Sequence, residues 1–302
     1  MLITFATRPS ALARWQTHWV SHALKKIWPD LECLEQVITT QGDLILDKPL
    51  PEIGGKGLFT QELEAELLTG HVHAAVHSLK DLPVESQPGL TIGAIPARAD
   101  VRDVLISPDG YSLETLPEGA FVGTSSLRRS AQLLAYRPDL CIMPLRGNVD
   151  TRLRKVQEGQ YAAIILAGAG VSRLGLEAHI TQWLPLEIML PAPGQGALAV
   201  QCRADDIETL QYLSALDDPA ARATTLAERS FLAGLGGGCS LPIAAYGSMN
   251  GNEAEIELLG LAASPDGKQL VRGWGTGVNP VELGNDLAAQ VLAQGAGEFL
   301  HV

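Results

Sequence analysis

The chain has 302 residues, of which 46% are hydrophobic and 19% charged, an ordinary composition for a soluble globular protein. This length allows two or three domains with cores of their own, because single cores usually stop growing near about 250–300 residues. A formal net charge of −12 argues against a general nucleic-acid-binding protein. No apolar stretch approaches the roughly 18 residues that a membrane span needs, so we expect no membrane partner.

The N-terminal residues and the cysteines indicate a compartment. Residues 1–10 contain a run typical of a strand and lack the apolar core and the cleavage site of a signal peptide. The cysteines are widely spaced and form no Cys-x-x-Cys pair, so the sequence suggests neither a zinc site nor a disulfide framework. They are Cys33, Cys141, Cys202 and Cys239. We therefore expect a cytoplasmic protein with reduced thiols.

The chain begins with a pattern typical of a strand, a loop and a helix. Leu2–Thr7 is expected to form the strand, and Ser10 can cap the helix that follows. Arg8 and Ser10 lie in the loop, where ligands usually bind in such sheets, although a solvated loop residue is an equal alternative for Arg8. The helical spacing predicts an apolar stripe at Leu12, Trp15, Trp19 and Ala23.

Residues 41–56 are too polar and too rich in glycine to pack, and we expect a mobile loop or lid there. The Gly-Gly-Lys-Gly run at 54–57 lacks the spacing of a phosphate-binding Walker loop, so a nucleotide site is only weakly indicated. Thr60 is then expected to open a helix that ends near Leu68.

A short apolar run, Val72–His77, is followed by the adjacent charges Lys80 and Asp81. Charges at the end of a buried strand are costly to bury unless they are paired, which makes these two residues candidates for a site. A surface strand end with solvated charges is the alternative. Three histidines alternate along this segment without a cysteine or carboxylate to complete a metal set, so we interpret them as structural: His71, His73 and His77.

The middle of the chain is basic although the whole chain is acidic. Between Phe121 and Leu176 there are eight cationic and three acidic side chains, a local charge of +5, and seven of the fifteen arginines. The planar fork of arginine suits bidentate binding of carboxylate or phosphate. We therefore expect a polyanionic small molecule as the ligand.

Arginines follow three expected strands in this region, which are Phe121–Gly123, Cys141–Leu145 and Ala162–Leu166. Each strand leads into the start of a helix, where backbone donors and the helix dipole favour an anion. Arginines at three strand ends are hard to explain as a solvated face. The candidate ligands from these ends are Thr124, Ser126, Arg128, Arg129, Arg146, Arg152 and Arg173.

Gly234–Ile243 contains three consecutive glycines followed by Cys239. Without Cβ atoms the backbone can take positive φ and approach another surface closely, which would deliver the thiol into a crowded place. A cysteine thiolate is a strong nucleophile and hence a plausible attachment point. The alternative is a tight turn before a strand, with Cys239 as a small buried residue.

Two segments look like crossovers between domains, Pro96–Asp103 and Leu190–Cys202. We therefore expect an α/β protein in which residues 1–99 and 195–216 form a first lobe and residues 100–194 form a second lobe inserted into it, with a cleft between the lobes. Residues 217–302 would form a small α+β domain that carries Cys239.

Taken together, the motifs resemble the porphobilinogen deaminase family, also called hydroxymethylbilane synthases. The resemblance runs over nearly the whole chain. It is carried by the segments Arg8–Ser10, Gly54–Phe59, Ala75–Pro83, Gly123–Arg129, Arg146–Arg152, Gly194–Gly196 and Gly237–Cys239.

The resemblance implies a transferase that deaminates and polymerises four porphobilinogen units into the linear tetrapyrrole hydroxymethylbilane and releases ammonia. It implies a dipyrromethane cofactor joined through a thioether to Cys239. Asp81 would contact the pyrrole nitrogens and stabilise the cationic intermediate formed when ammonia leaves. The implied fold is two lobes like those of periplasmic binding proteins plus the small C-terminal domain, in a monomer without a metal.

The same resemblance gives roles to the remaining candidates. Lys56 and Phe59 would belong to the loop over the cleft. The cofactor would be held by Cys239, Lys80, Asp81, Thr124, Ser126, Arg128, Arg129 and Arg146. The substrate carboxylates would be held by Arg8, Ser10, Arg146, Arg152 and Arg173.

Two other classes of function are compatible with parts of the sequence. A two-lobed module that binds a small anion without chemistry explains the arginines but leaves Cys239 and Asp81 without a role. A cysteine hydrolase needs a histidine paired with Cys239, and no feature of the sequence nominates one.

Overall fold

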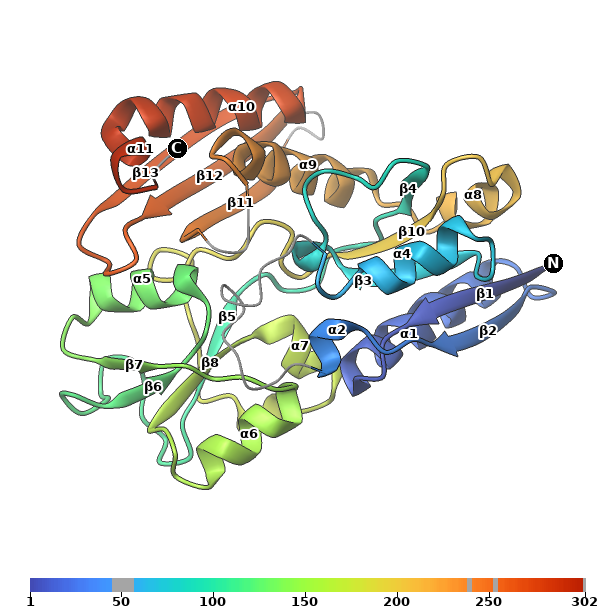
Figure 1. Ribbon diagram of the computed structural model, residues 1–302. Coiled ribbons are helices and arrows are strands. Elements are labelled where there is room, and N and C mark those ends of the chain that lie inside the picture. Colours follow the sequence, from blue (N-terminus) through green and yellow to red (C-terminus); the bar gives the residue numbers. More distant parts are fainter. Residues whose placement is uncertain (45–56, 238–240, 252–254, 301–302) are drawn as a thin grey trace. The chain divides into compact units, whose positions relative to one another are not determined.

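The computed structural model describes residues 1–44, 57–237, 241–251 and 255–300, which form three β-sheets with helices packed on them (Figure 1). Contacts divide these residues into two compact units. The first comprises 1–44, 57–99 and 197–222, and the second comprises 100–196 together with the described residues from 223 onward. The expected α/β class with a small C-terminal α+β part is confirmed, whereas the boundaries of three separate domains stay a prediction.

The first unit is built on a five-stranded sheet in the order β2-β1-β3-β10-β4. β1 is parallel to β2 and β3, and β10 is antiparallel to its neighbours. Parallel neighbours need a crossover, which the helices supply. The elements are β1 (Leu2–Thr7), α1 (Ala11–Ile27), β2 (Glu32–Val37), α2 (Gln41–Leu44), α4 (Gln61–Leu68), β3 (Ala74–Ser78), the 3₁₀ turn η1 (Leu79–Asp81), β4 (Leu90–Ala94), β10 (Leu198–Arg203) and α8 (Ile207–Ser214).

Helix α1 buries a different face from the one its large apolar residues predict. The buried residues are Ala13, Gln16, Thr17, Val20 and Leu24, while Trp19 remains 37% exposed. Val20 and Leu24 pack against strand residues of the sheet, and the Gln16 amide donates to the Ser78 hydroxyl at 3.0 Å. The predicted stripe is therefore displaced by about one residue: Leu12, Trp15 and Ala23 are half-buried at the edge of the buried face, and Trp19 lies outside it.

The second unit contains a five-stranded sheet in the order β7-β6-β8-β5-β9. Its layout repeats that of the first sheet, since β6 is parallel to β7 and β8, and β5 is antiparallel to β8. The elements are β5 (Asp103–Ile106), β6 (Phe121–Gly123), α5 (Leu127–Tyr136), β7 (Cys141–Met143), α6 (Val149–Gln157), β8 (Ala163–Ala167), α7 (Gly168–Arg173), the 3₁₀ turn η2 (Glu177–His179) and β9 (Gln182–Trp183).

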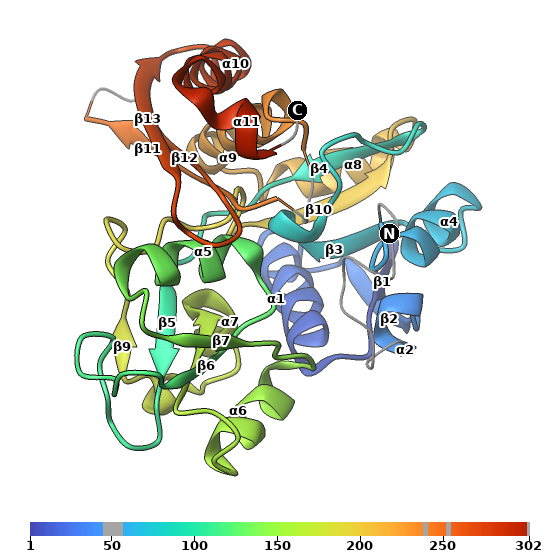
Figure 2. The ribbon, with the colours of Figure 1, turned by 60° about the vertical axis from the view of Figure 1, so that its left-hand side comes forward.

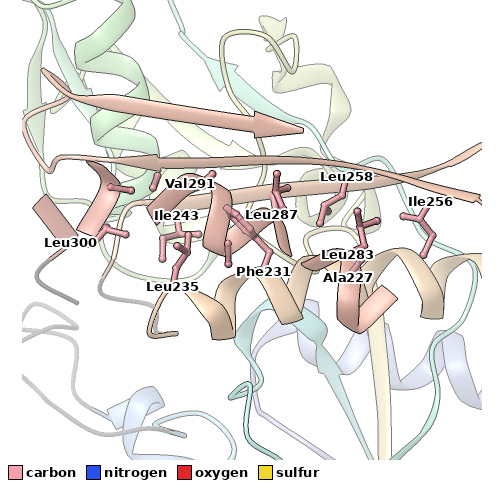
Figure 3. Close-up of a cluster of buried hydrophobic side chains, with 14 residues drawn as sticks. Ala227, Phe231, Leu235, Ile243, Ile256, Leu258, Leu283, Leu287, Val291 and Leu300 are labelled. Atoms are coloured by element: carbon pink, nitrogen blue, oxygen red, sulfur yellow. The ribbon is translucent and has the colours of Figure 1, made fainter. Parts of the chain in front are cut away.

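A three-stranded antiparallel sheet forms the C-terminal part, with its core against two helices (Figure 3). Phe231 and Leu287 are buried in this core, whereas Leu226 is 41% exposed. Asp218 accepts from the Ala221 amide at 2.8 Å at the start of the first helix, and Asn279 caps the last long helix. The elements are α9 (Pro219–Gly234), β11 (Ile243–Asn250), β12 (Glu255–Ala263), β13 (Leu270–Gly277), α10 (Pro280–Val291), the π-helical turn η3 (Leu292–Ala296) and α11 (Gly297–Leu300).

Within the second unit, the β12–β13 hairpin reaches helix α5 (Figures 1 and 2). A Cβ added to Gly267 at the hairpin tip would lie 2.4 Å from the Ala131 carbonyl oxygen, and the φ of Gly267 is +72°. Only glycine allows this approach and this backbone conformation. Ala131 also shares a buried cluster with Leu190 and Leu261. The C-terminal sheet is therefore packed onto the helix that begins with the Arg128–Arg129 pair.

Candidate functional site

In the first unit, Arg8 follows β1 and is held by a carboxylate that the sequence did not nominate. Its guanidinium forms a two-pronged ion pair with Asp43, with 3.1 Å between Nε and Oδ2, and it lies 4.2 Å from the centre of the Phe59 ring. Asp43 also accepts from the Thr40 hydroxyl at 2.8 Å. Burial alone would raise the pKa of Asp43, but Arg8 and Thr40 hold it below its usual value.

The structure describes only residues 41–44 of the segment 41–56, for which we expected a mobile loop or lid. Residues 41–44 form the short helix α2, so the start of the segment is ordered, and the remainder, with Lys56, lies outside the described residues. Gly42 packs against the Phe59 ring so closely that a Cβ would lie 2.1 Å from a ring carbon. The sequence placed Phe59 near a lid, and the structure brings it together with Arg8.

Ser10 serves as the N-cap of α1, as predicted, and its hydroxyl accepts from the Ala13 amide at 3.3 Å. One lone pair of the hydroxyl remains after this bond, so capping and ligand binding are compatible uses of the same side chain.

Lys80 and Asp81 follow β3 in the 3₁₀ turn η1. The turn is anchored by Leu79, whose side chain is fully buried and whose amide donates to the Ala197 carbonyl at 3.0 Å. Lys80 is half-buried and Asp81 is exposed. Within the described part of the chain, the Asp81 carboxylate makes no hydrogen bond or ion pair. A fixed turn thus presents an uncompensated negative charge beyond the carboxyl end of a parallel strand, a usual ligand position.

The three histidines of this segment lie in different environments. Nδ1 of His73 accepts from the Thr4 amide at 3.0 Å, and His71 pairs with Glu66 at 2.8 Å. His77 is buried, and burial lowers its pKa to about 4, so it is neutral at pH 7. The described residues include no cluster of histidine, cysteine and carboxylate side chains that could hold a metal ion.

In the second unit, β6 leads through Thr124 and Ser126 into α5. Ser126 is the N-cap of this helix, and its hydroxyl accepts from the Arg129 amide at 3.4 Å. The Ser126 amide donates to the Thr124 hydroxyl at 3.2 Å. The expected passage from strand to helix N-terminus is confirmed, and it places Arg128 and Arg129 in the first turn of α5.

The side chains of Arg128 and Arg129 are buried and both bind Asp103, the first residue of β5. Each guanidinium lies 2.7 Å from an Asp103 oxygen. Burial by itself would raise the pKa of Asp103, but the two arginine charges hold it well below its usual range. The prediction placed these arginines in an anion site at a helix N-terminus and did not include Asp103 among the candidate residues.

The loop after β7 carries Arg146, and Arg152 lies in the first turns of helix α6; both are half-buried. Nε of Arg152 donates to the Gly147 carbonyl at 2.7 Å, and Lys155 donates to the Arg146 carbonyl at 3.2 Å. Gly147 has a φ of +112°, which an L side chain rarely adopts. The Arg146–Gly147 segment is therefore held by hydrogen bonds from side chains of helix α6.

Arg173 ends α7 after β8, and its guanidinium donates to the Gly196 carbonyl at 2.7 Å. In the described ranges it has no carboxylate partner. Burial lowers the pKa of Arg173 to about 10, so it stays charged at pH 7. A half-buried cation without a counter-charge is a position where an anionic ligand would be stabilised.

Cys239 lies outside the described residues, and the structure describes the chain on both sides of it. Leu235 is fully buried at the end of α9, and Gly236 and Gly237 have φ values of +84° and +46°. The positive φ expected for the glycine run is confirmed at these two positions. The segment that leads to the thiol thus begins from a fixed helix.

Comparisons with known proteins agree along the whole chain. The family described as "Porphobilinogen deaminase, dipyromethane cofactor binding domain" matches residues 3–211, and its C-terminal domain matches residues 223–293. The porphobilinogen deaminase of Brevibacillus brevis is 55% identical over 97% of this chain and 95% of its own. That of Roseiflexus castenholzii is 50% identical over 99% of this chain and 98% of its own.

Among solved structures, the methionine binding protein MetQ is similar over 71% of this chain and 89% of its own, at 15% identity and a TM-score of 0.46. The two family matches and the full-length relatives decide the assignment. The chain belongs to the porphobilinogen deaminase family.

Proposed function

We propose that this protein is a porphobilinogen deaminase, which joins four porphobilinogen units into hydroxymethylbilane and releases one ammonia for each unit joined. The observation that carries the proposal is the family match over both parts of the chain, with relatives about half identical along its full length. The polycarboxylate nature of porphobilinogen suits a chain that places arginines after successive strands of one sheet.

We propose Asp81 as the catalytic residue. Loss of ammonia from porphobilinogen breaks the carbon–nitrogen bond of the aminomethyl group and leaves positive charge on the pyrrole. A carboxylate without an ion-pair partner can stabilise that charge more than it stabilises the neutral ring, which is what lowers the barrier. The exposure of Asp81 and its lack of partners among the described residues support this role.

The family's dipyrromethane supplies the primer to which the first substrate is joined, and we propose that it is attached through a thioether to Cys239. The residues present fit such a group, since its acetate and propionate side chains need cations. Arg173 is a desolvated cation that forms no ion pair with a carboxylate of the described residues. Arg128 and Arg129 carry two positive charges against the single negative charge of Asp103. The other proposed cofactor contacts are Lys80, Asp81, Thr124, Ser126 and Arg146.

Substrate carboxylates are proposed to bind Arg8, Ser10, Arg146, Arg152 and Arg173. Arg8 is already paired with Asp43, so a substrate carboxylate would share this guanidinium or displace Asp43 from it. Lys56 and Phe59 are proposed to cover the bound chain. The contact of Phe59 with Arg8 supports a common location for these two residues.

We further propose a cytoplasmic monomer that does not bind nucleic acid. The acidic net charge of −12 supports the last point, and a thioether can form only from a reduced thiol, which supports a reducing compartment. Within the described ranges, no helix combines the length and the hydropathy required to cross a membrane.

The proposed function is tested by incubating the purified full chain with porphobilinogen. We expect porphobilinogen to be consumed with release of an equal amount of ammonia, and a linear tetrapyrrole to accumulate. Ehrlich's reagent should also detect a pyrrole bound to the protein before any substrate is added. A protein that binds porphobilinogen without consuming it would instead be an anion-binding module.

Replacement of Arg173 by leucine is expected to slow turnover and to stall the reaction with part-built chains on the protein. One hydrogen bond to a charged group contributes about 1.5–3 kcal/mol, which corresponds to a loss of roughly tenfold to 150-fold in kcat/KM. The fold should persist, because an apolar side chain removes a desolvated charge from the interior. Steady-state kinetics and intact mass of the protein during turnover measure both effects.

The matched control for this variant is Arg154→Leu in helix α6 of the same unit. The Arg154 side chain is 68% exposed and only 3.7 Å from Glu158, a surface pair that contributes little. Full turnover in Arg173→Leu, equal to that of the control, would remove Arg173 from the proposed site.

A further inference from the structure

Asp103 is a buried carboxylate that joins three side chains from distant parts of the second unit. Its exposed fraction is 0%, and its oxygens bind Arg128 and Arg129 from the start of α5. The third partner is Gln195, whose amide nitrogen lies 3.0 Å from Oδ1 of Asp103 and 2.8 Å from the Val101 carbonyl oxygen. No motif of the sequence included Asp103.

The two arginines need this carboxylate in order to lie side by side. They are adjacent in sequence and both buried, so their like charges repel in a region of low dielectric. Burial lowers the pKa of Arg128, and the charge of Arg129 acts in the same direction. One Asp103 charge against two arginine charges leaves the cluster with a net charge of +1.

The hydrogen bonds of the two guanidiniums differ. Arg129 donates through Nε and Nη2 to Asp103 and through Nη1 to the Ile165 carbonyl. Arg128 donates through Nη1 alone, to Asp103 at 2.7 Å and to the Leu190 carbonyl at 2.8 Å. The Nε–Nη2 edge of Arg128 therefore makes no hydrogen bond within the described part of the chain. Arginine can use this edge to bind a carboxylate through two parallel hydrogen bonds.

The loop that supplies Gln195 is also linked to Arg173. Gly194 and Gly196 have φ values of +77° and +85°, which turn the chain so that the Gln195 side chain points inward. The carbonyl of Gly196, the next residue, accepts from Arg173 at 2.7 Å. Asp103 and this loop thus connect Arg128, Arg129 and Arg173.

We propose that Asp103, supported by Gln195, is a positioning residue that holds Arg128 and Arg129 as a receptor for one carboxylate, taken up by the free edge of Arg128. The net charge of +1 matches a single carboxylate. The inference rests on the proposed function in one respect, since the carboxylate is taken to be an acetate or propionate of the pyrrole chain.

The test uses the full chain produced in cells that make no porphobilinogen and then titrated with preformed hydroxymethylbilane. The fraction of protein that carries the covalent adduct is read by intact mass. For Asp103→Asn we expect the concentration that gives half-loading to rise by about tenfold to a hundredfold, the range seen when orienting partners of metal ligands are lost. Loading should also become more sensitive to salt, because the cluster now carries one more positive charge.

A merely structural role for Asp103 would lower the amount of competent protein equally at every salt concentration. An unchanged half-loading concentration, or an unchanged salt dependence, would overturn the proposal. Asp139→Asn is the matched control, since it removes a partly exposed ion pair with Arg137 in the same unit. This variant should load like the parent.

Gln195→Ala decides the question if Asp103→Asn does not fold. This variant keeps all charges, so we expect weaker loading with the salt dependence of the parent, and parent-like loading would overturn the proposal. A parent protein that does not load and does not consume porphobilinogen would contradict the proposed function, whereas a loading parent with unaffected variants contradicts only the role of Asp103.

Discussion

The Asp81→Asn variant is expected to fold like the parent and to turn over about a thousandfold more slowly. Asparagine keeps the shape of the side chain and a hydrogen-bond acceptor but removes the charge. A carboxylate about 4 Å from a developing cation contributes roughly 4 kcal/mol at an effective dielectric of about 20. If that interaction forms chiefly in the transition state, the corresponding loss in rate is about a thousandfold.

The position of Asp81 separates this loss of turnover from a folding defect. Its side chain is exposed and makes no hydrogen bond or ion pair within the described residues, so the substitution removes no contact seen there. The turn that carries it is fixed by the burial of Leu79 and by the hydrogen bond from the Leu79 amide to Ala197. Porphobilinogen should still bind, because the arginines are unchanged.

The variant must be assayed after loading with preformed tetrapyrrole, because the assembly of the cofactor uses the same chemistry. Asp30→Asn is the control, since Asp30 is another exposed aspartate of the first unit and lies in a turn. A loaded, folded Asp81→Asn protein that turns over within about tenfold of the parent, a barrier change of about 1.4 kcal/mol, would show that Asp81 does not stabilise the cation.

The local features of this protein could be predicted from the sequence. Ser10 is found as the helix cap that its type and position indicated, because a cap depends on residues within one turn. Strand ends were located for the same reason, since each apolar run stops at a polar loop. Lys80 and Asp81 accordingly lie where the sequence placed them, directly after a strand.

The partners of the site residues could not be predicted in the same way. Asp43 is 35 residues from Arg8, and Asp103 is 25 residues from Arg128. Such pairs depend on the order of strands in the sheet, to which neither periodicity nor local spacing responds. The error on α1 has a similar origin, because the face buried by a helix is set by the shape of the sheet beneath it as well as by its largest apolar residues.

The Cys239→Ser variant is expected to lose both the bound pyrrole adduct and all turnover. A serine hydroxyl is a far weaker nucleophile than a thiolate at neutral pH, so the thioether cannot be replaced by an ether at a useful rate. The fold should persist, because serine is close to cysteine in size and shape. Intact mass and the Ehrlich reaction of the purified variant measure the loss of the adduct.

The other cysteines provide the control that makes this result specific. Cys202 is buried, and burial raises its pKa to about 11, so it offers little thiolate. Cys141 is exposed on β7, and Cys141→Ser should keep the parent's adduct and turnover. In the parent, the added mass should be confined to the peptide that contains Cys239. An adduct that survives in Cys239→Ser, or that is lost in Cys141→Ser, would place the attachment point elsewhere. Replacement of the thiol that carries the pyrroles must remove both the added mass and the turnover, and replacement of another thiol must remove neither.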